Sequence, residues 1–240
     1  MSKTTYTIHP LHVGTIRRKK ENMSYGCGDQ TPTNFPLIVW YLAGGGRNLL
    51  VDTGGSAPDG VHWMPYEREA DQRPDLVLRK LGVAPEEISG ILLTHLHWDH
   101  AGNNQRFPNA ERFVQRLEYE TLVRAGEAGL PGFERELALH GHYTLLEGDC
   151  APLPGIRCYL TPGHTAGSQC IEVSTAQGPY LLGGDLITLF ENWTAVPHIP
   201  NGGYYDLDVM RTSLDKVEAL GCTVLPGHDF KVFEHSVYPI

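Results

Sequence analysis

Short apolar segments recur along the chain, separated by glycine, proline and polar residues. Residues 36–42 (PLIVWYL) are apolar and rich in β-branched and aromatic side chains, and residues 48–51 (NLLV) follow a glycine triplet. Such a pattern predicts two strands joined by a turn. Similar apolar segments predict further strands at 90–94, 111–114, 156–160, 170–174, 180–182 and 222–225.

Between the strands, apolar residues recur with helical periodicity at 74–81, 116–125 and 207–220. Pro74 at the start of the first segment and Gly221 after the last are typical of helix boundaries. Alternating strands and helices predict an α/β fold in which helices cover β-sheets.

Two of the predicted hairpins end on an aspartate. Residues 36–51 lead into Asp52, and residues 170–182 lead through a turn at 177–179 to Asp185. A duplicated architecture would explain this similarity, and so would a chance likeness between two ordinary hairpins. The pattern leaves both explanations open.

The predicted strand at 90–94 runs directly into the segment HLHWDH (95–100), in which four of six residues can bind a metal. In an extended segment the side chains of His95 and His97 point to the same side. Asp99 and His100 follow where the next helix would begin. Neutral imidazoles and carboxylates suit Zn²⁺ or a similar divalent ion, so this segment predicts a metal site at the end of a strand.

Three more potential ligands follow predicted strands. His164 lies in TPGHT (161–165), Asp185 follows a glycine pair, and His228 lies in PGHD (226–229). Each of them alone would more often be an ordinary loop residue. Together with the first segment, they predict a site built from several strand ends at the edge of a sheet.

The composition limits the class of partner. The chain has 240 residues, with 19 Lys and Arg against 28 Asp and Glu, and a formal net charge of −9. Nucleic-acid binding requires clustered positive charge, and we interpret the basic cluster at 17–20 as a solvated turn. We expect a small-molecule substrate and no nucleic-acid partner, and a homodimer stays open.

The sequence has no apolar stretch of the roughly 18 residues that a membrane span needs, and its first residues lack the pattern of a secretory signal. Five cysteines, an odd number without a CxxC pair, favour reduced thiols. We therefore expect a cytoplasmic protein without a membrane partner. The length fits one large domain or two small ones.

The segment THLHWDHAG (94–102), followed by His164, Asp185 and His228, resembles the metallo-β-lactamase superfamily. The gaps of 64, 21 and 43 residues from His100 onward are similar to those of the N-acyl-homoserine lactonase branch. The resemblance spans nearly the whole chain. It implies a four-layer αββα sandwich with two pseudo-symmetric halves, and a single hydrolase domain over residues 1–240.

The resemblance also implies two divalent metal ions, with Zn²⁺ expected and Mn²⁺ or Fe²⁺ as alternatives. Asp185 would bridge the ions together with a hydroxide, Asp99 would also shuttle a proton, and Asp52 would orient a ligand histidine from outside, although it also fits a simple turn cap. The remaining ligands form two sets of three: His95, His97 and His164, and Asp99, His100 and His228.

The implied activity is the opening of a lactone or a related cyclic acyl compound. A thioesterase of the glyoxalase II type, a cyclic amide hydrolase and a metal-binding module without catalysis are the alternatives. Lactonases of this branch often carry Tyr three residues after the bridging Asp, where this chain has Thr. The segment 190–205 predicts a long irregular connection near the substrate. Expected substrate contacts are Trp98, Thr188, Trp193, His198 and Tyr204.

Overall fold

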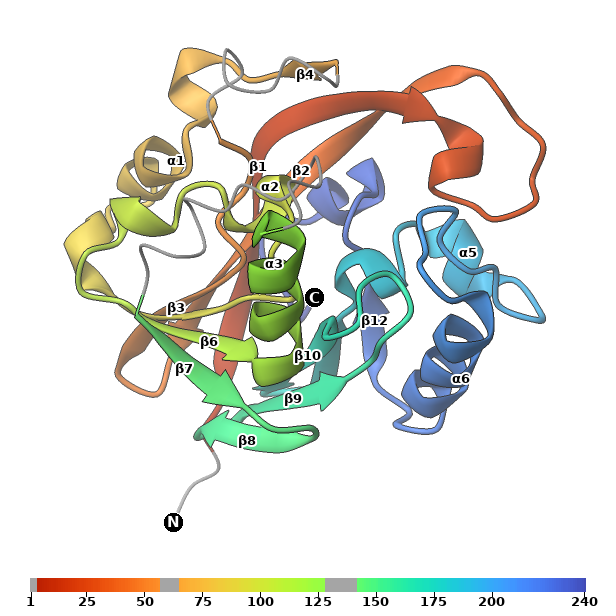
Figure 1. The fold of residues 1–240 in the computed structure, drawn as a ribbon. Helices are drawn as coiled ribbons and strands as arrows, with labels where there is room; N and C mark the ends of the chain where they lie inside the picture. The colour runs from red at the N-terminus through yellow and green to blue at the C-terminus, as the bar shows by residue number, and fades with distance from the viewer. Residues whose placement is uncertain (1–3, 57–64, 128–141) are drawn as a thin grey trace.

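The apolar segments form two β-sheets in the computed structural model, which describes residues 4–56, 65–127 and 142–240 (Figure 1). Within these residues the strand orders are β4-β1-β2-β3-β5-β6-β7 and β12-β11-β10-β9-β8. The first sheet contains β1 (Tyr6–Lys19), β2 (Pro32–Gly44), β3 (Arg47–Val51), β4 (Tyr66–Glu67), β5 (Ile88–Leu92), β6 (Glu111–Gln115) and β7 (Tyr143–Leu146). The second contains β8 (Cys150–Leu153), β9 (Ile156–Leu160), β10 (Gln169–Thr175), β11 (Gly178–Leu182) and β12 (Thr223–Leu225).

Helices cover the outer faces of both sheets (Figure 1). The predicted helices at 74–81, 116–125 and 207–220 correspond to α1, α3 and α6. Asp206 caps α6, because its side chain accepts hydrogen bonds from the first turn of the helix. The five α-helices of the described ranges are α1 (Pro74–Lys80), α2 (Trp98–Ala101), α3 (Arg116–Glu127), α5 (Phe190–Thr194) and α6 (Leu207–Glu218).

Three apolar clusters show how the layers stack. The first joins side chains of α1, α2 and α3 to the first sheet, for example Leu78 and Leu122 against Leu50. The second joins the two sheets, and the third joins the second sheet to α6 through residues such as Met210 and Leu181. These three buried interfaces separate four layers in the order helices, sheet, sheet, helices. The fold is thus the four-layer αββα sandwich that the family resemblance implied.

Strands in the middle of this sandwich are buried on both faces, which explains their continuous apolar sequences. In β3, Leu50 faces the helices, whereas Leu49 and Val51 face the second sheet. In β10, Ile171 faces the first sheet and its neighbour Cys170 faces α6. The alternation follows from the two-residue period of a strand.

The two sheets repeat one pattern of strand pairing. In the first, β1-β2-β3 are antiparallel neighbours and β5 adds in parallel to β3. In the second, β9-β10-β11 are antiparallel and β12 adds in parallel to β11. Asp52 and Asp185 follow the equivalent strands β3 and β11, so duplicated halves account for the two hairpins that end on an aspartate.

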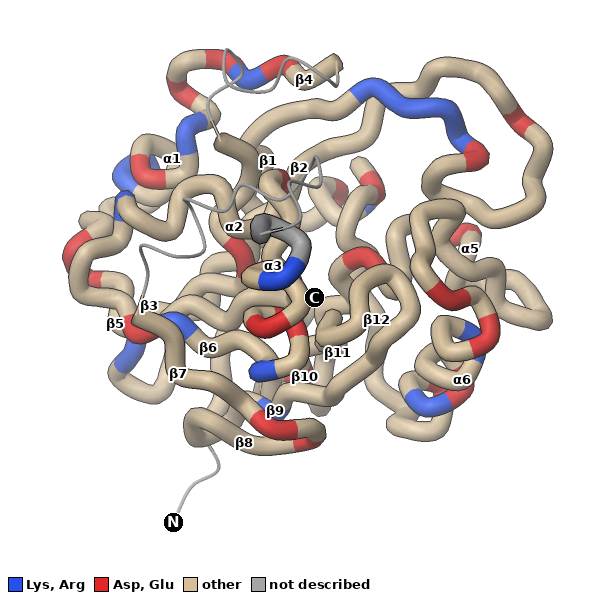
Figure 2. The backbone as a smooth tube through the Cα atoms, viewed as in Figure 1, with Lys and Arg blue, Asp and Glu red and all other residues tan. Residues whose placement is uncertain are grey.

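β1 is a long strand that the apolar pattern did not predict. Pro10 and Gly14 interrupt its alternation, and its register with β2 shifts along the strand. β4 pairs only with Thr15 and Ile16, so Pro10 is not required to donate a hydrogen bond to a second neighbour. The basic residues 17–20 occupy the end of β1 and the 3₁₀ turn that follows it (Figure 2). The interpretation of this cluster as a turn was therefore wrong for its first three residues.

The segment 190–205 is also more regular than expected, because it begins with the short helix α5 (Phe190–Thr194).

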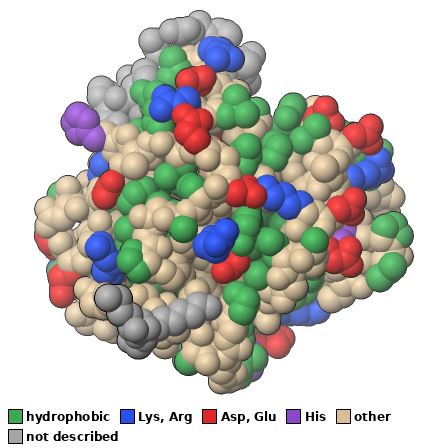
Figure 3. Space-filling view, turned by 90° about the horizontal axis from the view of Figure 1, so that it is seen from below, with side chains coloured by type: hydrophobic (Ala, Val, Ile, Leu, Met, Phe, Trp, Pro, Cys, Tyr) green, Lys and Arg blue, Asp and Glu red, His purple; other side chains and the backbone are tan. Residues whose placement is uncertain are grey.

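Charged side chains of both signs are interspersed over the face shown in Figure 3. Among the helices of the described ranges, none is long and apolar enough to cross a membrane.

Candidate metal centre

The HLHWDH segment lies where β5 ends in the first sheet. β5 ends at Leu92, the chain reaches His95 and His97 in extended form, and α2 begins at Trp98. The amide of Thr94 donates to Asp52 Oδ1 at 2.8 Å. Because β3 and β5 are parallel neighbours, their polar ends meet at the same edge of the sheet.

Three imidazoles from the two halves of the fold meet at this edge. His164, in the connection between β9 and β10, brings its Nε2 to 2.9 Å from Nδ1 of His97. The same Nδ1 lies 3.0 Å from Nε2 of His95. The ligand atoms of these three residues lie within 4.8 Å of one another.

Asp185 lies between this group and a second one. Its Oδ2 is 3.2 Å from His164 Nε2, and its Oδ1 is 2.9 Å from His228 Nε2 and 3.1 Å from His100 Nε2. Asp99, His100 and His228 form a further group whose ligand atoms lie within 4.8 Å of one another. The structure thus brings together all seven residues that the sequence predicted as ligands.

The donor set fits divalent cations. His97 Nδ1 faces two imidazole nitrogens at once, and a single proton cannot lie between both pairs. His100 Nε2 is buried and has no hydrogen-bond partner among the described residues, although Asp185 Oδ1 is close. A buried polar atom without a partner is costly in a protein interior, and a metal ion at about 2.0–2.1 Å would satisfy it.

Four histidines of the cluster fall into two pairs whose pKa values are shifted in opposite directions. Burial lowers the pKa of His97 to about 3 and that of His95 well below its usual range, and the neighbouring imidazoles add to both effects. Burial also opposes the protonation of His100 and His228, but nearby carboxylates, above all Asp185, raise the pKa of each. His95 and His97 are therefore neutral imidazoles at neutral pH.

The outer ring nitrogens of the histidines are held by acceptors. A carbonyl or carboxylate oxygen requires the facing nitrogen to carry a proton, so in the neutral imidazole the lone pair lies on Nε2 and is directed into the cluster. Three such hydrogen bonds run from His164 Nδ1 to Gly203 O at 2.6 Å, from His228 Nδ1 to Pro36 O at 2.9 Å and from His100 Nδ1 to Asp52 Oδ2 at 2.8 Å.

His95 is oriented through a hydroxyl. The Thr94 hydroxyl donates to Asp52 Oδ2 at 2.8 Å, so its oxygen is free to accept from His95 Nδ1 at 3.1 Å. Asp52 thereby supports two histidines, one directly and one through Thr94. Asp52 has φ of 61°, a left-handed conformation that aspartate tolerates better than most residues.

Glu118, in the first turn of α3, was not predicted as part of the site. It is 2% exposed and accepts hydrogen bonds from the amide of Leu96, the hydroxyl of Thr165 and the amide of Gly167. Burial raises the pKa of Glu118, and the three donors oppose this effect. The carboxylate ties the segment that carries His95 and His97 to the loop that carries His164. In the sequence, nothing distinguishes it from other glutamates of the helix.

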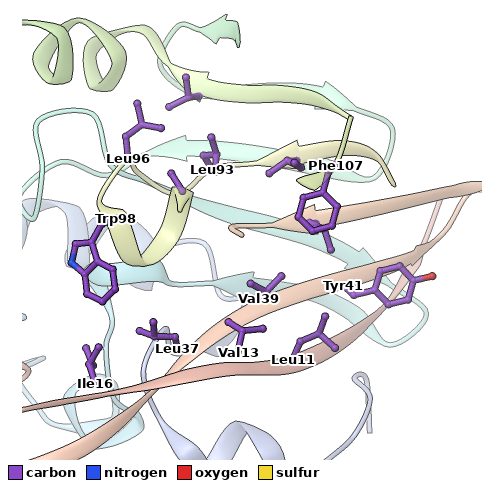
Figure 4. Packing of buried hydrophobic residues seen from close by; sticks show 14 of the residues in the cluster. Leu11, Val13, Ile16, Leu37, Val39, Tyr41, Leu93, Leu96, Trp98 and Phe107 are labelled. Atoms are coloured by element: carbon purple, nitrogen blue, oxygen red, sulfur yellow. The ribbon is translucent and has the colours of Figure 1, made fainter. Parts of the chain in front are cut away.

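Trp98 belongs to the core beneath the site. It is 3% exposed and packs with residues such as Leu37 in the cluster between the first sheet and its helices (Figure 4). Its ring meets Tyr66 edge to face, with centroids 5.0 Å apart. This geometry favours a packing role over the predicted substrate contact.

Thr188 is also a packing residue. It is fully buried, and its hydroxyl donates to the carbonyl of Met23 at 2.7 Å and accepts from Asn192 at 3.0 Å. With both functions of the hydroxyl used inside the protein, the predicted contact with substrate is not favoured.

Trp193 and His198 stack on each other, with ring centroids 4.0 Å apart. His198 Nε2 lies 3.7 Å from Glu218, the last residue of α6. Asp206, just before the first residue of α6, hydrogen-bonds to Gly163 beside His164. At 1.5 Å per residue the two ends of this helix are about 16 Å apart, so the structure does not bring Trp193 and His198 to the cluster.

Tyr204 is the predicted substrate contact that lies beside the cluster and is exposed. It follows Gly203, whose carbonyl holds His164, and 42% of its surface is accessible. Its ring meets the exposed ring of Tyr25 edge to face at 5.5 Å. Tyr25 belongs to the connection between β1 and β2, so two segments far apart in sequence place aromatic side chains near His164.

Known proteins resemble this chain in sequence and in fold. A model of the metallo-beta-lactamase superfamily matches residues 34–233. The chain is 33% identical to an N-acyl homoserine lactonase of a Bacillus species and 30% identical to one of Bacillus thuringiensis, and each match covers 82% of this chain and 83% of the relative. A crystal structure of a quorum-quenching N-acyl homoserine lactone hydrolase is similar over 100% of this chain and 99% of its own, with a TM-score of 0.86 and 26% identity.

Proposed function

Because the chain belongs to the metallo-β-lactamase superfamily, we propose that the cluster around Asp185 binds two divalent metal ions with which this hydrolase opens a lactone ring. The observation that carries the proposal is the position of Asp185. Its two oxygens contact histidines of both three-residue groups, at 2.9–3.2 Å. A carboxylate in this position is suited to bridging two ions.

Three overlapping groups of ligand atoms support a division between two ions. His95, His97 and His164 would hold one ion, Asp99, His100 and His228 would hold the other, and the group of His95, His100 and Asp185 joins the two. Imidazole nitrogens and carboxylate oxygens suit Zn²⁺, and Mn²⁺ or Fe²⁺ would accept the same set.

Two such ions would lower the pKa of a bound water and polarise the carbonyl group of the substrate. The side chains of the protein orient the ligands and transfer the proton. Asp99 lies at the start of α2 within the group of His100 and His228 and is 9% exposed. We assign to Asp99 the transfer of a proton to the leaving oxygen of the ring. Asp52 keeps His100 oriented by its hydrogen bond to Nδ1.

The relatives named N-acyl homoserine lactonases support an acyl-homoserine lactone as substrate, and hence a quorum-quenching role. Tyr204 and Tyr25 would contact the apolar part of such a molecule, because both are exposed beside the loop that holds His164. The apolar core shared by the two sheets supports one hydrolase domain over residues 1–240.

A hydrolysis screen of the zinc-loaded protein tests this function. It should include acyl-homoserine lactones, aromatic lactones, cyclic amides and thioesters, with the hydrolysed product measured by mass spectrometry as the common readout. We expect lactones to be turned over fastest, Asp99→Asn to lose most of this turnover while staying folded, and Asp71→Asn, an exposed carboxylate paired with Lys80, to match the wild type. Faster turnover of thioesters or cyclic amides would replace the lactonase proposal by those activities, and full activity of Asp99→Asn would remove its assigned role.

A further inference from the structure

Two cysteines face each other at the outer edge of the second sheet, away from the metal ligands. β8 and β9 pair in antiparallel fashion, and their register sets Cys150 directly opposite Cys158. Residues opposite each other in such a pair have Cα atoms about 4.5–5.5 Å apart. A disulfide requires about 4.4–6.8 Å, so the spacing typical of this register suits a disulfide.

The two thiols differ in their access to solvent. Both pack at the interface of the two sheets, where Cys158 is fully buried and Cys150 is half-buried at the margin. A small oxidant from solution therefore reaches Cys150 first. Cys158 is placed to react only with a group already attached to Cys150.

The two thiols also differ in acidity, and the more accessible Cys150 is the more acidic. A hydrogen bond from Cys158 lowers the pKa of Cys150 to about 7, against the effect of burial. The same hydrogen bond, together with burial, raises the pKa of Cys158. At neutral pH the half-buried Cys150 is thus partly thiolate, which is the nucleophilic form, beside a thiol that keeps its proton.

We propose that Cys150 and Cys158 are a redox modification site, which a peroxide converts reversibly into a cross-strand disulfide. The sulfur of Cys150 attacks one peroxide oxygen, the O–O bond breaks, and the second oxygen leaves as hydroxide and is protonated to water. Cys150 is then a sulfenic acid. The sulfur of Cys158 attacks the sulfur of Cys150, the S–O bond breaks, and the proton of Cys158 leaves with the hydroxide as a second water. Two thiols lose two electrons, and one peroxide is reduced.

The other cysteines lack this combination. Cys170 lies opposite Tyr159 and burial raises its pKa to about 12, while burial and Glu172 raise the pKa of Cys222 to about 11. Cys27 is exposed in the connection between β1 and β2.

The test treats the full-length, metal-loaded protein with one equivalent of hydrogen peroxide and counts free thiols after unfolding. We expect the five thiols of the chain to fall to about three, a mass loss of about 2 Da for one disulfide, and a cross-linked pair of peptides that contain Cys150 and Cys158. Dithiothreitol should restore all five.

Cys150→Ser, which changes the partly exposed member, should lose no thiol under the same treatment. Cys222→Ser is the matched control and should still lose two. Cys158→Ala leaves the nucleophile without its partner, and its sulfenic acid should be captured by dimedone at Cys150. A disulfide that maps to other cysteines, or an unchanged thiol count in the wild type, would overturn the proposal.

Discussion

Asp52 Oδ2 accepts a hydrogen bond from His100 Nδ1 at 2.8 Å, although 48 residues separate the two in sequence. Both residues are buried. The contact exists because β3 and β5 are parallel neighbours that end at the same edge of the sheet. Through this hydrogen bond Asp52, which lies outside the cluster, sets the orientation of the His100 ring inside it.

Asp52→Asn tests this dependence. The amide of Thr94, its hydroxyl and His100 Nδ1 all donate to Asp52, so an amide side chain would turn an NH₂ group toward at least one donor. Asn also tolerates the left-handed backbone of this position. We expect the affinity for Zn²⁺ to fall about 10- to 100-fold, as for other outer partners of metal ligands.

Competition with a chromophoric chelator measures this affinity, and Asp71→Asn serves as the exposed control. Wild-type affinity in Asp52→Asn would show that the carboxylate only caps the turn.

Glu118→Gln probes the link between the two histidine segments. Its three partners, Leu96 N, Thr165 Oγ1 and Gly167 N, are all donors, which a carboxylate satisfies and an amide does not. We expect a loss of about 1–3 kcal/mol in the unfolding free energy of the metal-free protein. Zn²⁺ affinity should also fall at least several-fold.

Glu120→Gln is the matched control, because Glu120 lies on the same helix, its side chain is 43% exposed, and it forms an i,i+4 ion pair with Arg124 at the surface. Thermal unfolding with and without Zn²⁺ separates the two effects. If Glu118→Gln destabilised the metal-free protein but bound Zn²⁺ as tightly as Glu120→Gln, Glu118 would support the fold and not the site.

Metal binding should release protons at neutral pH. Carboxylates around Asp185 raise the pKa of His100 and His228 against the effect of burial, so the metal-free protein keeps protons there above the usual pKa of about 6.5. Their stabilising effect on the metal-free protein is complete below that pH and is lost as pH rises through the raised pKa. A metal ion must displace these protons, so its affinity rises with pH.

Calorimetric titration with Zn²⁺ in buffers of different ionisation enthalpy counts the protons. Binding at pH 7 without proton release would contradict the raised pKa values.

Thr188→Val should affect stability and leave substrate affinity alone. The hydroxyl donates to Met23 O, which also accepts from Asn192, and it accepts a second hydrogen bond from Asn192 itself. Its loss therefore leaves the carbonyl paired but one buried N–H of Asn192 without its acceptor. We expect a cost of about 1–3 kcal/mol and an unchanged KM, and Thr188→Ser should behave as the wild type in both. A raised KM for Thr188→Val alone would restore Thr188 as a substrate contact.

The sequence predicted which residues the fold would bring together, because each follows an apolar strand and parallel strands end at a common edge. It did not separate packing from binding at Trp98 or Thr188, since an aromatic ring or a hydroxyl has the same sequence signal in a core and in a pocket. Glu118 was missed because its three donors come from loops distant in sequence, so its role exists only in the folded chain.

The long strand β1 escaped prediction for a related reason. Pro10 and Gly14 argue against a strand locally, and pairing with β2 along most of its length overrides them. The helices α1, α3 and α6 were predicted to within a few residues, because periodicity and boundary residues such as Pro74 are local signals.

The metal content of the purified, zinc-loaded chain tests the central claim most directly. Elemental analysis after removal of loosely bound metal should give close to two Zn²⁺ per chain, because Asp185 joins two complete three-residue groups. A content of one ion or none per chain would contradict the dinuclear centre.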